Sequence, residues 1–122
     1  EETKGKSPFL FFHGMAPGGY APYLPMIFAG ILKSQHRNRD MFIFENNPIA
    51  SMLCFGALSE EDTVQGVLEA VQTHLGSSPK ANNLTLCGHS FGSCQLAWMS
   101  KAPEMKKRIR SLVLLDPVSI LL

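Results

Sequence analysis

Hydrophobic residues along this chain fall into two alternating patterns. In the first pattern they form short continuous runs, which is typical of strands buried on both faces of a sheet. These runs cover residues 8–12, 41–44, 84–87 and 111–115. In the second pattern they recur every three or four positions, as on a helix that buries one face. The alternation of strand and helix predicts an α/β fold, with a parallel sheet and helices on both of its faces.

The helix expected between the second and third strands has the clearest boundaries. Ser59 and Asp62 form a capping-box-like start, and Gly76 with Pro79 ends the segment. The apolar residues of this segment would lie on one helix face: Val64, Val67, Leu68, Val71 and Leu75.

Three further helical segments are expected. One covers residues 23–36, with Pro22 and Pro25 near its start, where proline is tolerated. Its apolar spacing comes from Leu24, Ile27, Phe28, Ile31 and Leu32. A second runs from Ser90 to about Ser100, and a short helical turn covers residues 105–109.

The length and net charge of the chain limit the number of domains and the kinds of binding partner that are expected. At 122 residues the chain forms at most one domain. Its formal net charge of +1 gives no electrostatic basis for binding nucleic acid or an anionic membrane. A local basic cluster is expected to be a solvated helix end, since cations favour helix C-termini. This cluster contains Lys106, Lys107, Arg108 and Arg110.

The cysteines give no indication of a structural zinc site. Cys54, Cys87 and Cys94 form no Cys-x-x-Cys pair and no ligand spacing with the four histidines, so no structural zinc site is expected. Cys87 and Cys94 are expected to be buried packing residues. Such a low cysteine count favours a reducing, intracellular compartment. Within residues 1–122 no signal peptide is expected, and no apolar run approaches the roughly 20 residues of a membrane span, so the location stays open.

A residue with chemical potential follows each predicted strand. These residues are His13, Glu45, Ser90 and Asp116. In open α/β sheets, ligands bind beyond the carboxyl ends of the strands, where the strand order reverses. With the strand order 2-1-3-4, the first and third strands are neighbours. The loop that begins His13-Gly14 and the turn at Ser90 would then meet.

The segment Gly88-His89-Ser90-Phe91-Gly92 matches the pattern Gly-x-Ser-x-Gly between a strand and a helix. A chain that turns sharply from strand to helix needs little side-chain bulk at the turn. Gly88 and Gly92 occupy the two positions where a side chain would collide with neighbouring backbone. The serine is then left on a tight bend with its hydroxyl exposed, an arrangement known as a nucleophile elbow.

Together these motifs resemble the central part of an α/β-hydrolase. The resemblance rests on His13-Gly14, on the Gly-x-Ser-x-Gly segment at Ser90, and on Leu114-Leu115-Asp116-Pro117. It spans about residues 8–117, nearly the whole chain. It implies a partial α/β-hydrolase core.

The resemblance also implies roles for individual residues. Ser90 matches the nucleophile that attacks an ester-like carbonyl, and the N–H groups of Met15 and Phe91 match the oxyanion-hole donors. The residues that would shape the site are His13, Gly14, Gly88, His89 and Gly92. Cys87 and Ser93 depart from the commonest lipase pattern, which leaves the substrate class unassigned.

The arrangement lacks a histidine base. A serine hydroxyl becomes a good nucleophile when a histidine takes its proton, and in the family this histidine comes last in the chain, yet no histidine follows Ser90. His89 is not expected to reach the serine hydroxyl, because successive strand residues point to opposite faces. His36 and His74 are expected at the surface.

Two carboxylates remain as candidates. Asp116 is either the triad acid, as in a minority of the family, or a structural residue at the strand end. Glu45 is expected to orient a loop. The missing base, the apolar segment 118–122 and the absence of earlier strands predict that residues 1–122 are a single partial domain. Such a fragment would lack the first strands and the C-terminal histidine module.

The sequence therefore predicts a serine hydrolase that cleaves an ester, thioester or similar acyl bond of a small molecule through an acyl-serine intermediate. No cofactor or metal is expected, and no Gly-x-x-x-x-Gly-Lys or Gly-x-Gly-x-x-Gly phosphate loop follows a strand. Tyr20, Tyr23 and Phe28 would line an acyl pocket, although helix packing explains Phe28 equally well. The alternatives are a non-catalytic ligand- or protein-binding module, and an acyltransferase or cofactor-free oxidative enzyme. The isolated chain is expected to be inactive.

Overall fold

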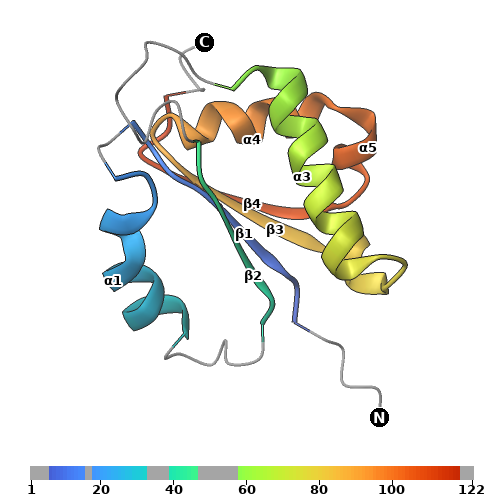
Figure 1. Cartoon of the computed structure of the whole chain (residues 1–122), viewed down its shortest axis with the longest axis horizontal. Helices are drawn as coiled ribbons and strands as arrows, with labels where there is room; N and C mark the ends of the chain where they lie inside the picture. Colours follow the sequence, from blue (N-terminus) through green and yellow to red (C-terminus); the bar gives the residue numbers. More distant parts are fainter. Residues whose placement is uncertain (1–5, 16–17, 33–38, 47–57, 119–122) are drawn as a thin grey trace.

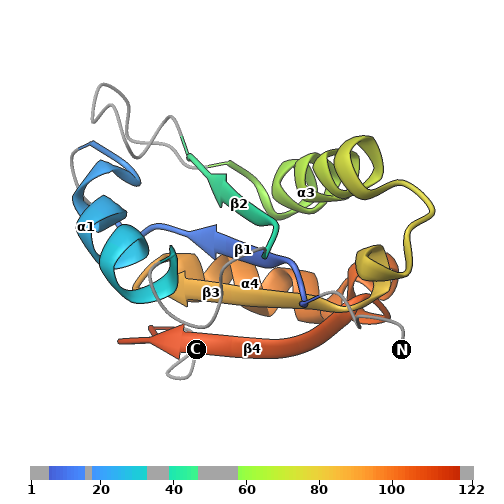
Figure 2. The same cartoon turned by 90° about the horizontal axis from the view of Figure 1, so that it is seen from below.

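The computed structural model describes residues 6–15, 18–32, 39–46 and 58–118. Its centre is a sheet of four parallel strands in the order β2-β1-β3-β4. The strands are β1 (Phe9–Phe12), β2 (Met41–Phe44), β3 (Leu84–His89) and β4 (Ile109–Leu115). Figure 2 shows them one below another in this order. The predicted α/β class and strand order are both confirmed.

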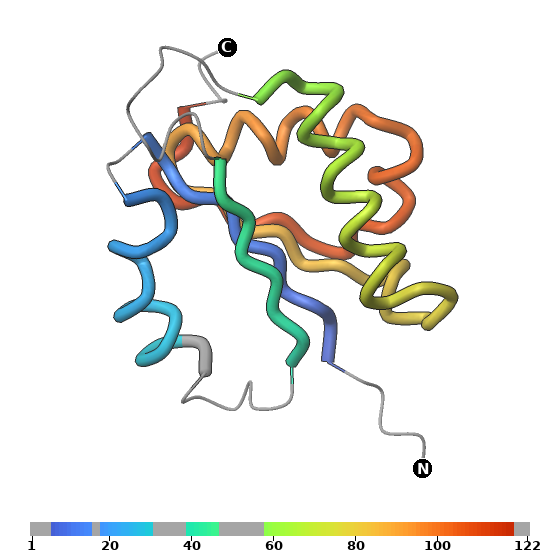
Figure 3. The backbone as a smooth tube through the Cα atoms, viewed as in Figure 1, coloured from blue at the N-terminus to red at the C-terminus, as the bar shows by residue number. Residues whose placement is uncertain are grey.

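Helices cover both faces of the sheet (Figures 1 and 3). On one face lies an irregular helical segment made of η1 (Ala21–Tyr23), α1 (Leu24–Met26) and η2 (Ile27–Leu32). On the other face lie α3 (Glu60–Leu75), α4 (Gly92–Lys101) and α5 (Pro103–Lys106), with the short turn η3 (Pro79–Asn82) before β3.

Successive side chains of the central strands pack alternately into the two halves of the core, one on each face of the sheet. Leu10 and Phe12 of β1 pack toward α3 and α4, whereas Phe9 and Phe11 pack toward the irregular segment. A strand buried on both faces must be apolar at every position, since successive side chains point to opposite faces. This arrangement explains the apolar runs of β1 and β3, which are buried. It does not hold at the edges of the sheet: β2 is half-buried, and Leu112, Val113 and Leu114 of β4 are 38–42% exposed, so the expected burial of β4 on both faces was wrong.

The predicted ends of α3 are confirmed by its capping contacts. The N–H of Asp62 donates to Oγ of Ser59 at 3.0 Å, which satisfies one of the free N–H groups of the first turn. At the other end, Gly76 adopts a φ of +52° and its N–H donates to the carbonyl of Gln72 at 3.0 Å. Val67 and Val71 of the predicted apolar face are buried.

The first helical segment departs from the regular helix expected over residues 23–36. Its hydrogen bonding changes from 3₁₀ through one α turn to a π-helix, and residues 33–36 lie outside the described part. The change of period moves residues around the axis. Ile27 is therefore buried, whereas Phe28, expected on the same apolar face, is 55% exposed.

The last two elements also differ from the expectation. The short helix α5 begins at Pro103, which is tolerated in a first turn, and ends at Lys106, so the turn expected over residues 105–109 was misplaced. Strand β4 already begins at Ile109, because its pairing with β3 extends to Leu84. Arg110 is consequently a strand residue, and its prediction as part of a solvated helix end was wrong.

Candidate active site

Ser90 lies on the single sharp turn between β3 and α4. Its φ of +50° is unusual for a residue other than glycine. The Ser90 N–H donates to the carbonyl of Leu115 at 3.0 Å, and the Ser90 carbonyl accepts from the N–H and Oγ of Ser93 at 2.9 and 2.6 Å. These three hydrogen bonds hold the strained conformation.

The two flanking glycines have no room for a side chain. A Cβ on Gly88 would lie 2.6 Å from the carbonyl oxygen of Gly92, and a Cβ on Gly92 would lie 2.3 Å from that of Phe12. Both distances are far below van der Waals contact, and both neighbours are backbone atoms that cannot turn aside. The expected collision at these positions is therefore confirmed.

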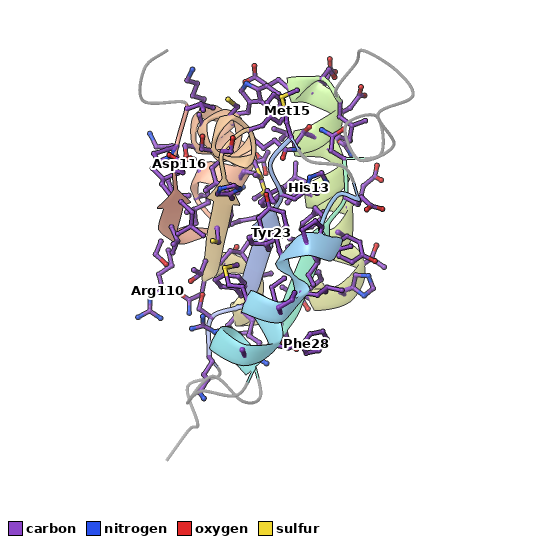
Figure 4. All side chains as sticks on the ribbon, turned by 90° about the vertical axis from the view of Figure 1, so that its left-hand side faces the viewer. His13, Met15, Tyr23, Phe28, Arg110 and Asp116 are labelled. Atoms are coloured by element: carbon purple, nitrogen blue, oxygen red, sulfur yellow. The ribbon has the colours of Figure 1, made fainter. Side chains whose placement is uncertain are left out.

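The loop after β1 meets the Ser90 turn, as the strand order predicts. A Cβ placed on Gly14 would lie 3.1 Å from Cβ of Ser90 and 3.1 Å from Nδ1 of His89. The two segments are far apart in sequence and come together because β1 and β3 are paired neighbours. Figure 4 shows His13, Met15 and Asp116 toward the same end of the molecule.

His13 is a buried residue that ties this loop to the loop after β2. Its Nδ1 lies 2.8 Å from the carbonyl oxygen of Gly14, and its Nε2 accepts a hydrogen bond from the N–H of Asn46 at 2.9 Å. These partners assign the proton to Nδ1. With both ring nitrogens engaged and 2% of its surface exposed, His13 is built to shape the loop.

Tyr23 and His89 make a contact that sequence reasoning missed. The Tyr23 hydroxyl accepts from the Gly14 N–H at 3.0 Å and lies 2.7 Å from Nδ1 of His89. The Tyr23 ring packs against Phe11 at a centroid distance of 5.0 Å, which holds the hydroxyl in place. The available signal was a tyrosine shortly after the His-Gly loop, but the sequence analysis predicted for it only the wall of an acyl pocket.

The two expected oxyanion donors make no hydrogen bond to the described residues. Within the described residues, neither the N–H of Met15 nor that of Phe91 donates a hydrogen bond. The Met15 side chain is 72% exposed, and the Phe91 ring meets Trp98 edge-on at 6.2 Å. The Gly14 N–H, in contrast, donates to the Tyr23 hydroxyl, so Met15 is the first residue of this loop whose N–H has no partner among the described residues.

None of the described histidines bonds the Ser90 hydroxyl. The ring of His89 is turned to Tyr23 instead, as its strand position predicts. His74 is exposed near the end of α3, also as expected. The fourth histidine, His36, lies outside the described residues.

The two candidate carboxylates are both exposed. Asp116 follows β4 directly, with a φ of +46°, and its neighbour Leu115 accepts the hydrogen bond from Ser90. This places Asp116 beside the Ser90 turn. Glu45 makes no hydrogen bond or ion pair to the described residues. The contact that the structure shows for this loop comes from the backbone of Asn46. Residues 47–57 lie outside the described part, so the loop-orienting role of Glu45 stays a prediction.

Cys87 lies beneath this site on β3. Burial raises the pKa of its thiol to about 11, since the thiolate would lose its hydration there. Cys87 is thus the packing residue that was expected, while Cys94 is only half-buried and Cys54 lies outside the described part.

The described residues contain no group of three His, Cys, Asp or Glu side chains that could hold a metal ion. Among the described helices, none has the length and apolar character needed to cross a membrane.

Compared with models of known protein families the chain matches none, and a search among curated proteins finds no similar sequence.

Proposed function

We propose that this chain carries the nucleophile and oxyanion-binding part of a serine hydrolase that acts on an ester, thioester or related acyl bond. The observation that carries the proposal is Ser90 itself, held at a φ of +50° between two glycines whose Cβ positions are filled by backbone. A strained turn of this kind is costly, and strain of this kind gathers at functional sites.

The proposed reaction uses the atoms around that turn. Oγ of Ser90 attacks the carbonyl carbon of the substrate and loses its proton to a base. The carbonyl oxygen becomes an oxyanion that accepts hydrogen bonds from the N–H groups of Met15 and Phe91. When the tetrahedral intermediate collapses, the bond to the alcohol or thiol breaks, the leaving group takes the proton, and water later hydrolyses acyl-Ser90.

The base is the part that no described residue supplies. His13 has both ring nitrogens engaged, and the ring of His89 is bonded to Tyr23. The proposal therefore includes a histidine provided from outside the described residues. Asp116, beside the turn, is in the right region to orient such a histidine.

The test is labelling of the full-length protein with a fluorophosphonate probe. Wild type is expected to be labelled at Ser90, and Ser90→Ala is expected to abolish labelling. Ser100→Ala is the matched control, because Ser100 is a serine of α4 whose hydroxyl bonds the Leu96 carbonyl at 2.8 Å, away from the turn. It should be labelled like wild type. A folded wild type that is not labelled would contradict the proposal.

A second candidate is a non-catalytic binding module on the same fold. The observation that favours it is the absence of any histidine bonded to Ser90 within the described residues. It predicts no labelling of the full-length protein, whereas an acyltransferase would be labelled and would transfer the acyl group to an alcohol in preference to water.

A further inference from the structure

A pocket lies at the opposite end of the sheet from Ser90. It has a volume of about 760 Å³, and its walls come from residues at the amino ends of the strands and from η3. Lys6 precedes β1, Arg39 precedes β2, Asn83 precedes β3, and Arg110 lies at the start of β4. Figure 4 shows Arg110 displaced from the end that carries His13, Met15 and Asp116.

The charge around this pocket is strongly one-sided. Four cationic side chains line it: Lys6, Arg39, Lys80 and Arg110. The described residues of its walls include no acidic side chain. Asp40, beside the pocket, pairs with Lys80 at 3.0 Å and offsets part of its charge, so the net positive charge here is smaller than the number of cations. A chain with a net charge of only +1 thus concentrates positive charge at one place.

Arg39 carries a buried donor without an acceptor. Its Nε is excluded from solvent and makes no hydrogen bond within the described structure. The guanidinium lies over the ring of Phe9, with Cζ 6.0 Å from the ring centroid, which supports it through a cation–π contact. Buried donors are nearly always satisfied, so an unpartnered one beside a pocket points to an acceptor that belongs there.

Arg110 reaches the pocket because of a break in strand register. Leu84 pairs with Ile109 and Thr85 pairs with Ser111, so Arg110 is an extra residue with no partner on β3. Bulges of this kind re-aim a side chain. Arg110 is exposed and makes no hydrogen bond or ion pair to the other described residues. Its guanidinium is therefore available to a ligand.

We propose that this pocket binds a phosphate-bearing small molecule. Two guanidinium groups offer paired donors that match the oxygens of a phosphate, and two ammonium groups add positive charge. A phosphate group of charge near −2 suits four cations better than a single carboxylate does. Since the sequence has no phosphate-binding glycine loop, recognition here rests on side chains. The proposal is independent of Ser90 chemistry.

The test measures binding of pyrophosphate to the 122-residue chain by isothermal titration calorimetry, at low and at physiological ionic strength. Arg39→Gln and Arg110→Gln should each weaken binding roughly tenfold, since each removes a charge-assisted contact. Arg39→Lys should also weaken it, because lysine keeps the charge but loses the paired donors. The control is Lys101→Gln with Lys106→Gln, which removes two charges from exposed positions in α4 and α5 and should bind like wild type.

The same proteins are then sedimented with phosphatidylcholine vesicles that contain or lack phosphatidic acid. Sedimentation that needs phosphatidic acid and Arg110 identifies a lipid headgroup as the source of the phosphate. Pyrophosphate binding without sedimentation identifies a soluble ligand. No binding, or equal weakening by the Lys101 and Lys106 control, would overturn the proposal. Because Arg110 is exposed, its variant should fold, and circular dichroism checks this.

Discussion

The phenolic oxygen of Tyr23 lies 2.7 Å from Nδ1 of His89. The same oxygen accepts the Gly14 N–H at 3.0 Å. One hydroxyl group thus joins the loop after β1, the helical segment that follows it and the last residue of β3. It engages Nδ1 of the His89 ring, and it fixes the backbone just before Met15.

Tyr23→Phe should loosen the loop that carries the Met15 N–H. Removing the hydroxyl leaves two partly buried groups unpaired, the Gly14 N–H and the His89 Nδ1, which should cost about 1–2 kcal/mol in the free energy of unfolding. The Gly14 amide should exchange with deuterium faster. In the full-length protein, fluorophosphonate labelling should slow roughly tenfold, because the oxyanion donor is less well positioned.

Tyr20→Phe is the control for this change. Tyr20 lies three residues away, is half-buried and makes no side-chain hydrogen bond within the described residues. In Tyr20→Phe the exchange rate of the Gly14 amide and the free energy of unfolding should both equal those of wild type. An unchanged exchange rate of the Gly14 amide in Tyr23→Phe would show that the Tyr23 hydroxyl does not fix this loop. That outcome is independent of whether Ser90 is labelled.

Gly92→Ala should be strongly destabilising. The added Cβ would lie 2.3 Å from the Phe12 carbonyl oxygen, so α4 and β1 would have to separate. We expect a loss of about 3 kcal/mol or more, at the upper end of overpacking costs. Urea denaturation of the purified variant measures it.

Gly66→Ala is the matched control, since Gly66 lies inside α3 and a Cβ there meets nothing within 4 Å. It should stabilise the protein by about 0.5–1 kcal/mol through the better helix propensity of alanine. Similar effects of the two substitutions would show that the close approach at Gly92 is not the cause.

Ser90→Gly should be more stable than Ser90→Ala by about 1 kcal/mol. Glycine adopts a φ of +50° without strain, whereas alanine keeps the steric cost that serine has. Both variants lack the hydroxyl, so both should escape fluorophosphonate labelling. Thermal unfolding of the pair isolates the backbone strain from the loss of the nucleophile, and equal stability would mean that the turn relaxes.

Cys87 should make stability depend on alkaline pH. Its pKa is raised to about 11 in the folded protein, so above the ordinary thiol pKa of 9.0 the unfolded chain loses the proton first. Ionisation then favours unfolding, and the free energy of unfolding should fall between pH 9 and pH 11, by at most about 1.4 kcal/mol per pH unit.

Denaturant melts at several pH values between 9 and 11 measure this dependence. In Cys87→Ala the free energy of unfolding should fall less steeply with pH than in wild type. Cys94→Ala provides the comparison, because Cys94 is half-buried in α4. It should keep the slope of wild type. If Cys87→Ala keeps that slope as well, another group causes the loss of stability.

Much of the fold could be predicted because its signals are local. A strand covered on both faces needs an apolar residue at every position, so β1 is visible as a continuous run. Ser59 and Gly76 mark the ends of α3 through contacts within one turn. The irregular segment after Tyr20 could not be predicted in the same way, since its change of helical period depends on packing against the sheet.

Part of the candidate site was also predictable. Gly88, Gly92 and Ser90 follow from the steric demands of a tight turn, and the meeting of Gly14 with Ser90 follows from the strand order. The role of Arg110 was not predictable, because a register break between two strands leaves no mark in the sequence of either one.

By itself, then, the sequence determined the order of strands and helical segments, the ends of α3, and where the chain must turn without side-chain bulk. Those properties depend on neighbouring residues. Only the tertiary structure decided that Tyr23 bridges Gly14 and His89, that His13 has both nitrogens engaged, and that Arg39 and Arg110 share a pocket. These contacts join residues many positions apart, and their geometry is set by how the sheet and helices pack.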